Sequence, residues 1–385
     1  MEAAMTLTRR RMLGLVGGGM ILAAGGGAGW AATREPQLAG RPWQLAGTYE
    51  GPRERALSWA LLAPNPHNRQ PWIADLREEG IVTLRADLGR LLPETDPYSR
   101  QITIGLGAFL ELMRMAAAAD GYRVEIVPFP DGEDPSELDG RPVARAVFLK
   151  EPDVAREPLF AQALARRSNK EPFDMTRPVP AASLERIGDV VRGTRFGNTV
   201  TEAEVVALRA LTREALRIEV ETPRTFQESV DLFRIGWREV DANPDGIDFT
   251  GPLFESLRMA GLFTREAAAD PSSQVYRAGL DAVFANADSA MGHLWLVSRD
   301  NSRVGQLAAG VDWLRVNLAV TTEGLGVQPL SQALQEYPEM DGLYREIHAR
   351  LAPEGGTVQM FARVGFGAVV PPSPRWSLES KIRNA

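Results

Sequence analysis

The stretch Ala63–Trp72, which reads APNPHNRQPW, decides how this chain is interpreted. Its prolines fix φ and remove backbone donors, and its asparagines favour turns, so the stretch predicts a stiff loop. His67, Asn68 and Gln70 place polar side chains on that loop, directly ahead of the indole of Trp72. One interpretation is a structural loop that the indole anchors in the core. The other is a ligand-binding loop.

A cationic motif at Leu164–Phe173, which reads LARRSNKEPF, bears on that choice. Together the two motifs resemble the nitroreductase family, in which an N-x-Q-P-W loop lies against flavin mononucleotide (FMN) and an R-R-S-x-R/K segment holds its phosphate and ribityl oxygens. The resemblance implies that the cofactor-binding positions are His67, Asn68, Gln70, Arg166, Arg167, Ser168 and Lys170.

The C-terminal part adds a third element. Val358–Gly367 predicts a buried strand that ends in glycines, and a proline-rich turn with Arg375 follows it. The resemblance implies that Arg375 contacts the phosphate; the alternative is a solvated surface arginine. Further candidates are Pro329, Leu330 and Ser331, whose backbone is expected to reach flavin N5, and Arg100, near the site or its lid.

These residue types suit FMN chemically. A dianionic phosphate needs cations, for which the planar donors of arginine are well shaped, and the ring needs oriented amides. Because the flavin itself carries hydride, no protein catalytic residue is expected. The chain has three histidines without metal-site spacing and no cysteine, so neither a metal site nor a disulfide is expected. His293 is expected to be packed in an apolar strand.

Two segments with identical spacing, Gly107–Gly121 and Gly310–Gly324, predict buried helices that end in glycine. We interpret them as an internal duplication, although any two buried helices ending in glycine look alike. The expected fold is α+β: a nitroreductase-like fold duplicated as a pseudo-dimer, with halves at 33–155 and 156–385. Each half carries a different motif, so one complete flavin site per chain and a monomer are expected. The resemblance extends in particular to Acg-type flavin-binding proteins.

The segment 226–290 has no counterpart in a minimal nitroreductase and is expected to form a lid. Its apolar residues Phe249, Phe254, Met259 and Phe263 would then face the flavin ring. The alternative is that they pack a pair of surface helices.

The N-terminus and the composition limit the setting. Thr8–Leu13 carries three arginines ahead of a glycine-rich apolar run, so residues 1–32 resemble a twin-arginine export signal. We therefore expect engagement of the twin-arginine (Tat) export machinery and a periplasmic or extracytoplasmic location; an uncleaved membrane anchor is the alternative. A net charge of −7 argues against a nucleic-acid partner.

Three functions follow from the sequence. The first is an FMN-dependent oxidoreductase that passes hydride from NAD(P)H or another donor to a quinone, nitroaromatic or conjugated acceptor. The second is an exported protein that sequesters or stores FMN under a lid without turnover. The third is a binding module without flavin. Export itself argues against a nicotinamide donor, because little free NAD(P)H is expected outside the cytoplasm.

Overall fold

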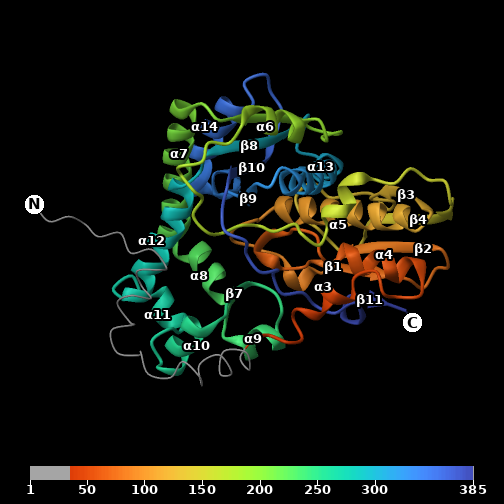
Figure 1. Ribbon diagram of the computed structural model, residues 1–385, viewed down its shortest axis with the longest axis horizontal. Helices are drawn as coiled ribbons and strands as arrows, with labels where there is room; N and C mark the ends of the chain where they lie inside the picture. Colours follow the sequence, from red (N-terminus) through yellow and green to blue (C-terminus); the bar gives the residue numbers. More distant parts are fainter. Residues whose placement is uncertain (1–34, 385) are drawn as a thin grey trace, which may run out of the picture.

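The computed structural model describes residues 35–384, and its elements are labelled in Figure 1. The expected export signal at residues 1–32 lies outside this range. Helices and strands are mixed along the chain, which confirms the predicted α+β class.

The first sheet has five strands in the order β11-β1-β2-β4-β3. Its neighbours are antiparallel except for β1 and β11, which are parallel. The strands are β1 (Trp72–Asp75), β2 (Ile81–Ala86), β3 (Tyr122–Pro128), β4 (Pro142–Lys150) and β11 (Ile382–Arg383). Because β11 is the last strand of the chain, the expected boundary at residue 155 does not separate the two halves: the C-terminus returns to the first sheet.

The second sheet has four antiparallel strands in the order β5-β8-β10-β9. They are β5 (Arg195–Thr199), β8 (Gly292–Ser298), β9 (Gly326–Pro329) and β10 (Thr357–Gly365). If β11 is left out and the strands of each sheet are numbered in chain order, both sheets have the same spatial order: first, second, fourth, third.

Two long helices, α5 (Arg100–Ala119) and α13 (Arg303–Thr322), lie between the sheets and pack against each other. Their backbones approach so closely at Gly107 and Gly310 that a Cβ on Gly310 would lie 2.0 Å from the carbonyl oxygen of Ile104. Only glycine fits there. By length and composition α5 could cross a membrane, but here it is a buried core helix. It begins at Arg100, earlier than the sequence predicted.

Shorter helices cover the sheets and build a lobe beside them (Figure 1). They are α3 (Arg41–Leu45), α4 (Pro52–Ala60), α6 (Ala181–Gly188), α7 (Glu202–Glu221), α8 (Pro223–Asp231), α9 (Trp237–Ala242), α10 (Pro252–Met259), α11 (Arg265–Ala269), α12 (Gln274–Asp288) and α14 (Asp341–Leu351). The two-stranded sheet β6 (Phe233–Ile235) and β7 (Ile247–Phe249) lies in the lobe. The 3-10 helices are η2 (Pro66–Asn68), η3 (Leu88–Arg90), η4 (Pro158–Gln162), η5 (Gln332–Leu334), η6 (Pro338–Met340) and η7 (Leu378–Ser380).

The connection from β5 to β8 spans 200–291, whereas the corresponding connection from β1 to β2 spans only 76–80. The extra segment therefore begins earlier than the expected 226–290 and includes α7. That helix packs against η5, next to the end of β9.

Candidate functional site

The loop between α4 and β1 has an unusual backbone. Three residues of the loop have positive φ angles: His67 at 45°, Asn68 at 51° and Gln70 at 50°. Non-glycine residues seldom adopt this backbone region, although asparagine, aspartate and histidine do so more often than the others. The amide of Gln70 donates to Asn65 Oδ1 at 2.7 Å, which closes the loop on itself. Such backbone persists only where the surroundings hold it, and it concentrates at ligand sites.

Gln70 is fully buried and fixes the loop. Its Nε2 donates to Pro244 O at 2.6 Å, and its Oε1 accepts from Trp376 N at 2.8 Å. The backbone oxygen of Gln70 accepts from Lys381 Nζ at 2.8 Å. This differs from the expectation that the Gln70 amide faces a flavin ring: its polar atoms are already taken by protein, so the residue positions the loop.

Arg166 and Arg375 meet at the carbonyl end of α4. Both donate to Leu62 O, at 3.0 and 3.3 Å respectively. Arg375 also donates to Leu61 O at 2.7 Å and to Asn68 Oδ1 at 2.6 Å. The structure thus joins the loop motif, the R-R-S motif and the C-terminal arginine, which are far apart in the sequence.

The two guanidinium groups are almost completely buried, with 3% of Arg166 and 2% of Arg375 exposed. Their hydrogen-bond acceptors in the described residues are carbonyl, amide and hydroxyl oxygens, not carboxylates. Burial lowers the pKa of Arg166 to about 10 and that of Arg375 to about 9; a neighbouring arginine lowers each pKa further, and the charge of Asp248 partly opposes the shift of Arg375. Paired buried cations without an acid are costly unless an anion joins them.

Arg166 retains the donors for such an anion. Its Nε and Nη1 are buried and have no hydrogen-bond partner among the described residues. Each of these two donors can make a charge-assisted hydrogen bond to a phosphate oxygen. The residues present therefore fit the phosphate of FMN. Arg375, in contrast, donates its N–H groups to protein oxygens.

The remaining cationic residues of the motif lie around this pair. Arg167 donates to Leu164 O at 2.7 Å and lies over the ring of Trp43, with Cζ 4.8 Å from the ring centroid. Ser168 is half-buried and Lys170 is exposed. The charge of Lys170 acts on His67, so the segment's ammonium and the loop's imidazole are near each other.

His67 is a neutral imidazole in this structure. Burial, with the charges of Lys170 and Arg69, lowers its pKa to about 4. Its Nδ1 is buried without a partner. A neutral ring with a free nitrogen at the tip of a strained loop is available to a ligand, which is consistent with an edge role rather than packing.

Pro329 ends β9, and Leu330 and Ser331 follow it, beside the cationic segment. Asn169 N donates to Val327 O at 2.8 Å, and Leu330 N donates to Phe361 O at 2.8 Å. These bonds place the end of β9 next to the R-R-S motif but occupy the Leu330 amide.

Sequence reasoning missed Arg363, which fixes this arrangement from β10. It is fully buried and donates to Gln328 Oε1 at 2.6 Å and to Glu171 O at 2.8 Å. The only sequence signal is an arginine within an apolar strand, which favours a specific internal partner.

Arg100 lies elsewhere. As the first residue of α5 it donates to Leu334 O at 2.7 Å and Gln359 O at 2.8 Å, and pairs with Glu336 at 3.2 Å. These contacts join α5 to η5 and β10. Arg100 therefore stabilises the packing of the two sheets and is not assembled with Arg166 and Arg375.

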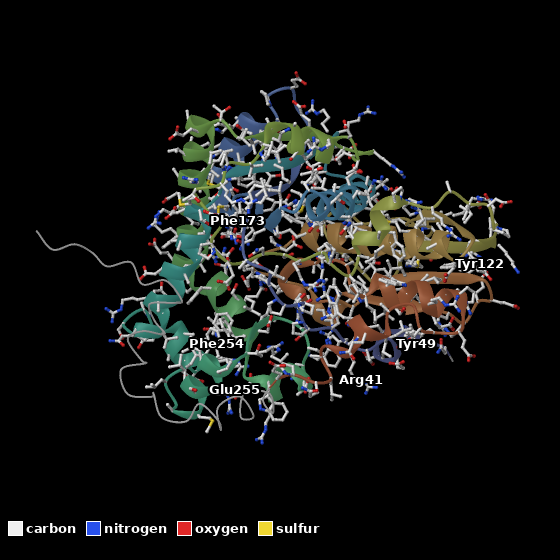
Figure 2. The ribbon with its side chains drawn as sticks, viewed as in Figure 1. Arg41, Tyr49, Tyr122, Phe173, Phe254 and Glu255 are labelled. Carbon is white, nitrogen blue, oxygen red and sulfur yellow. The ribbon has the colours of Figure 1, made fainter. Side chains whose placement is uncertain are left out.

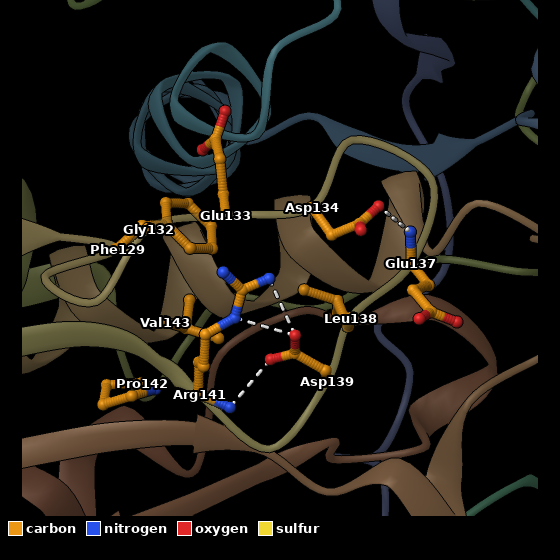
Figure 3. Close-up of a pocket in the computed structure, with 10 residues that line it drawn as sticks. All are labelled: Phe129, Gly132, Glu133, Asp134, Glu137, Leu138, Asp139, Arg141, Pro142 and Val143. Atoms are coloured by element: carbon orange, nitrogen blue, oxygen red, sulfur yellow. Dashed lines mark hydrogen bonds and ion pairs between the residues drawn. The ribbon is translucent and has the colours of Figure 1, made fainter.

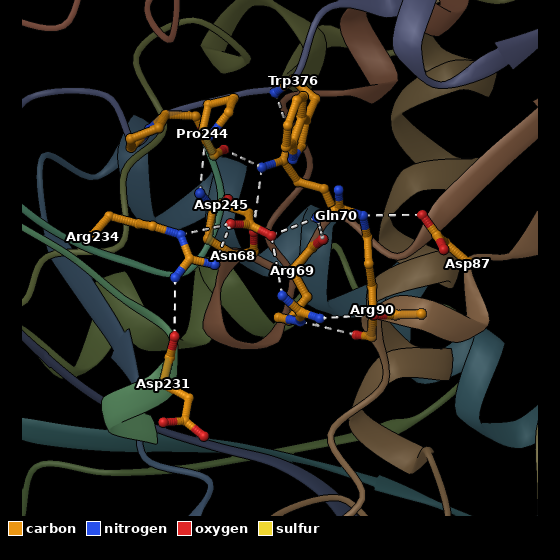
Figure 4. Close-up of polar contacts among 12 residues, drawn as sticks. Asn68, Arg69, Gln70, Asp87, Arg90, Asp231, Arg234, Pro244, Asp245 and Trp376 are labelled. Atoms are coloured by element: carbon orange, nitrogen blue, oxygen red, sulfur yellow. Dashed lines mark hydrogen bonds and ion pairs between the residues drawn. The ribbon is translucent and has the colours of Figure 1, made fainter. Parts of the chain in front are cut away.

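The extra lobe is fastened to the loop by Asp245 (Figure 4). Its buried carboxylate pairs with Arg69 at 3.1 Å, Arg90 at 2.5 Å and Arg234 at 2.7 Å. Because Pro244 also accepts from Gln70, the turn at 243–246 contacts the loop through both backbone and side chain.

The residues expected to face the flavin from a lid fall into two groups, packed phenylalanines and an exposed methionine. Phe249 packs edge-on against Phe233, Phe254 and Phe263 at centroid distances of 4.8, 5.2 and 5.0 Å. Phe254 is labelled in Figure 2 within the lobe. Met259 is 60% exposed, so it does not face a ring here. These phenylalanines therefore pack against one another within the lobe.

Two hollows lie apart from the buried arginines. The first, in the turn between β3 and β4 (Figure 3), has a volume of about 10 Å³, enough for about one water. The second, of about 310 Å³, is an open hollow beside Phe173 and Phe366. Within residues 35–384 no group of three histidine or acidic side chains is placed to hold a metal.

No family model matches the chain. It is 26% identical over 334 residues to "Putative NAD(P)H nitroreductase acg" of Mycobacterium tuberculosis, which covers 83% of this chain and 90% of that protein. A similarly named protein of that organism, Rv3131, is 25% identical over 333 residues, covering 85% and 89%. The chain is thus similar over most of its length to nitroreductase-like proteins.

Solved structures overlap it more weakly. The FMN-dependent nitroreductase NfnB from Mycobacterium smegmatis, in complex with NADPH, has 16% identity, a TM-score of 0.34, and covers 57% of this chain and 94% of its own. A nitroreductase-like protein from Bacillus cereus has 11% identity, a TM-score of 0.32, and covers 60% and 96%.

Proposed function

We propose that this chain binds FMN and acts as an oxidoreductase of the nitroreductase type. The observation that carries the proposal is the buried pair Arg166 and Arg375, whose hydrogen-bond acceptors among the described residues are all neutral oxygens and which leaves two donors of Arg166 free beside a strained loop. The nitroreductase-like relatives support the same conclusion.

In this proposal the protein binds and orients the cofactor. Arg166 holds the phosphate oxygens with its free donors, Arg167, Ser168 and Lys170 lie around them, and Arg375 contributes positive charge. When bound, the flavin supplies hydride transfer through N5 to a quinone, nitroaromatic or other conjugated acceptor. Asn68 keeps Arg375 in place through its Oδ1, and neutral His67 lies at the ring edge. The chemistry requires no protein nucleophile.

Anaerobic titration of the purified chain tests the proposal. We expect an oxidised flavin band that bleaches with NADPH or another low-potential donor and recovers on addition of a quinone or nitroaromatic. Protein that takes up no FMN on reconstitution would refute cofactor binding, and bound flavin that no donor reduces would refute the oxidoreductase.

The attachment of the lobe favours a second candidate, sequestration of FMN without turnover. Arg69 and Arg90 pair with Asp245 from outside the lobe, and together with the Gln70 contact they hold the lobe against the loop, as a lid that excludes nicotinamide would require. Flavin that resists NADPH but bleaches with dithionite is the expected result for sequestration. Rapid reduction by NADPH contradicts it.

We further propose that the chain is an internal duplication and acts as a monomeric pseudo-dimer with one flavin site. The shared strand order of the two sheets and the crossing of α5 and α13 support this. Sedimentation of the reconstituted protein, with FMN counted by absorbance, is expected to give a monomer with one FMN. Two FMN per chain would contradict the single site.

Export through the twin-arginine pathway is also part of the proposal and rests on Thr8–Leu13. That route carries folded proteins, so FMN would be loaded in the cytoplasm. Replacing Arg9, Arg10 and Arg11 with lysine is expected to retain the protein in the cytoplasm, as fractionation would show. Unchanged localisation would contradict this route.

A further inference from the structure

The segment Gln37–Leu45, here called the strap, runs from the lobe to the first sheet (Figure 1). Its lobe end is held by Asp241 of α9. The Asp241 carboxylate accepts from Gln37 N at 3.0 Å, Leu38 N at 2.8 Å and Ala39 N at 2.9 Å. One acidic side chain thus fixes three consecutive backbone donors, and charge-assisted bonds of this kind are among the stronger ones in proteins.

The strap is also joined to the segment that carries Arg375. Arg375 N donates to Ala39 O at 2.9 Å, and Trp43 Nε1 donates to Ser373 O at 2.8 Å. The strap therefore bridges the lobe and the cation-rich site. Arg41, labelled in Figure 2, lies on the outer side of this bridge.

Trp43 covers the cations directly. Its ring centroid lies 4.8 Å from Cζ of Arg167 and 5.5 Å from Cζ of Arg375, and its side chain is buried. An indole at these distances attracts a guanidinium and keeps water away from it. Excluding water strengthens any bond between these guanidinium groups and an anion, because the local dielectric is lower.

The free donors of Arg166 are enclosed, since its Nε and Nη1 have almost no contact with solvent. A phosphate therefore reaches them only when a covering segment moves. The strap is suited to be that segment because it is short and its indole lies over Arg167 and Arg375, the first adjacent to Arg166 in the chain and the second sharing the acceptor Leu62 O with it.

We propose that Gln37–Leu45 is a strap that closes over the cofactor phosphate, and that Trp43 is the residue through which it retains FMN. The inference rests on the proposed FMN binding. Cofactor enters while the strap is displaced, and the Asp241 and Ser373 contacts then form.

Release of FMN from the full-length chain tests the strap. We expect Trp43→Ala to speed FMN dissociation by about tenfold, the size of a desolvated cation–π contact. Trp43→Phe keeps a ring over the arginines and is expected to retain most of the slow release. Trp237→Ala is the matched control, because Trp237 also lies against an arginine, Arg238, but at α9.

A second measurement does not depend on removing the tryptophan. Hydrogen exchange of residues 37–45 in the unmodified chain is expected to slow at least several-fold when FMN is added. Asp241→Asn, which weakens the lobe anchor, is expected to reduce that protection, whereas Asp231→Asn on α8 is not.

The outcomes are distinguishable. A chain that binds no FMN refutes the proposed function itself. If FMN binds, but Trp43→Ala releases it at the rate of Trp237→Ala, or exchange at residues 37–45 is unchanged by FMN, the strap is refuted while FMN binding stands.

Discussion

The loop from α4 to β1 and the loop from α6 to β5 occupy the same place relative to their sheets, yet they are held in opposite ways. The first contains three residues with positive φ, and a nearby arginine retains unpartnered donors. The second, at 192–194, is fixed by Asp312 of α13. That carboxylate accepts from the backbone of Arg192, Gly193 and Thr194, each at 2.8 Å.

The arginines near the two loops also differ in whether their partners are acids. Near the second loop, Arg315 pairs with Glu111 at 3.1 Å and Glu157 at 2.6 Å, and Arg192 pairs with Glu157 at 3.0 Å. Each of these two arginines has an acid. Near the first loop, Arg166 and Arg375 donate to neutral oxygens.

One position on the central helices accounts for much of the contrast. Phe109 of α5 and Asp312 of α13 each stand two residues after the glycine at the helix crossing. Phe109 packs against Trp72, with centroids 4.8 Å apart, whereas Asp312 takes the backbone donors of its loop. The backbone donors of the second loop are thus satisfied by protein, whereas Arg166 beside the first loop keeps donors for a ligand.

The largest expected effect comes from removing the free cation. Arg166→Met is expected to weaken FMN binding by about a thousandfold, because two charge-assisted bonds are lost. The same variant is expected to leave the cofactor-free protein as stable as before, or about 1 kcal/mol more stable, since an unpaired buried charge is gone. Fluorescence titration and urea unfolding measure the two effects.

Arg315→Met is the control for that variant in the other half. It leaves Glu111 and Glu157 without their shared cation and is expected to lower the free energy of unfolding, with FMN affinity unchanged. If both variants behave alike, the two regions do not differ as described.

The next largest effect is expected at the second loop, residues 192–194. Asp312→Ala removes the acceptor of three backbone donors and the Thr194 hydroxyl, and is expected to lower the free energy of unfolding by about 3 kcal/mol. FMN affinity is expected to stay within about twofold of the original, because this loop binds no cofactor. Denaturant unfolding, with parallel FMN titration, checks both. A large loss of FMN affinity would mean that the second loop contributes to the site.

The sequence predicted the elements with local patterns and missed those that depend on distant partners. The segments Gly107–Gly121 and Gly310–Gly324 were predicted to be buried helices that end in glycine and lie largely in α5 and α13, because apolar periodicity and a terminal glycine are local signals. The grouping of Arg166, Asn68 and Arg375 came from motif resemblance. Asp245 and Asp312 carry no such pattern, since their partners lie more than 100 residues away in most cases and only the fold brings them together.

A smaller effect is expected at the attachment of the lobe. Asp245→Asn keeps the hydrogen-bond acceptor but removes the charge shared by Arg69, Arg90 and Arg234, and is expected to cost about 2 kcal/mol of stability. If the lobe limits access to the loop, FMN association and reduction by NADPH are expected to quicken by about tenfold. Stopped-flow mixing measures both rates. Unchanged rates with lower stability would mean that the attachment only stabilises the fold.

The smallest expected effect is the dependence of stability on pH that His67 causes. It can be compared with the effect of His293, which lies in the second sheet. Burial holds the pKa of His67 at about 4 and that of His293, in β8, at about 3, both below the ordinary 6.5. The unfolded chain therefore binds more protons than the folded one below pH 6.5. Each histidine consequently lowers the free energy of unfolding as pH falls from 6.5 towards its folded pKa.

A bound anion changes only one of these responses. FMN carries a dianionic phosphate, and its negative charge favours the protonated form of an imidazole at the ring edge, so bound FMN is expected to raise the pKa of His67 and to reduce the His67 part of the acid loss. His293, stacked on Phe361 at 5.1 Å in the second sheet, is expected to respond as it does without FMN. Urea unfolding between pH 4 and 7, compared with His67→Asn, isolates the difference, because asparagine tolerates the positive φ at this position. If the acid loss attributed to His67 is the same with and without FMN, the imidazole does not lie near the bound anion, and the free Nδ1 belongs to the loop rather than to the site.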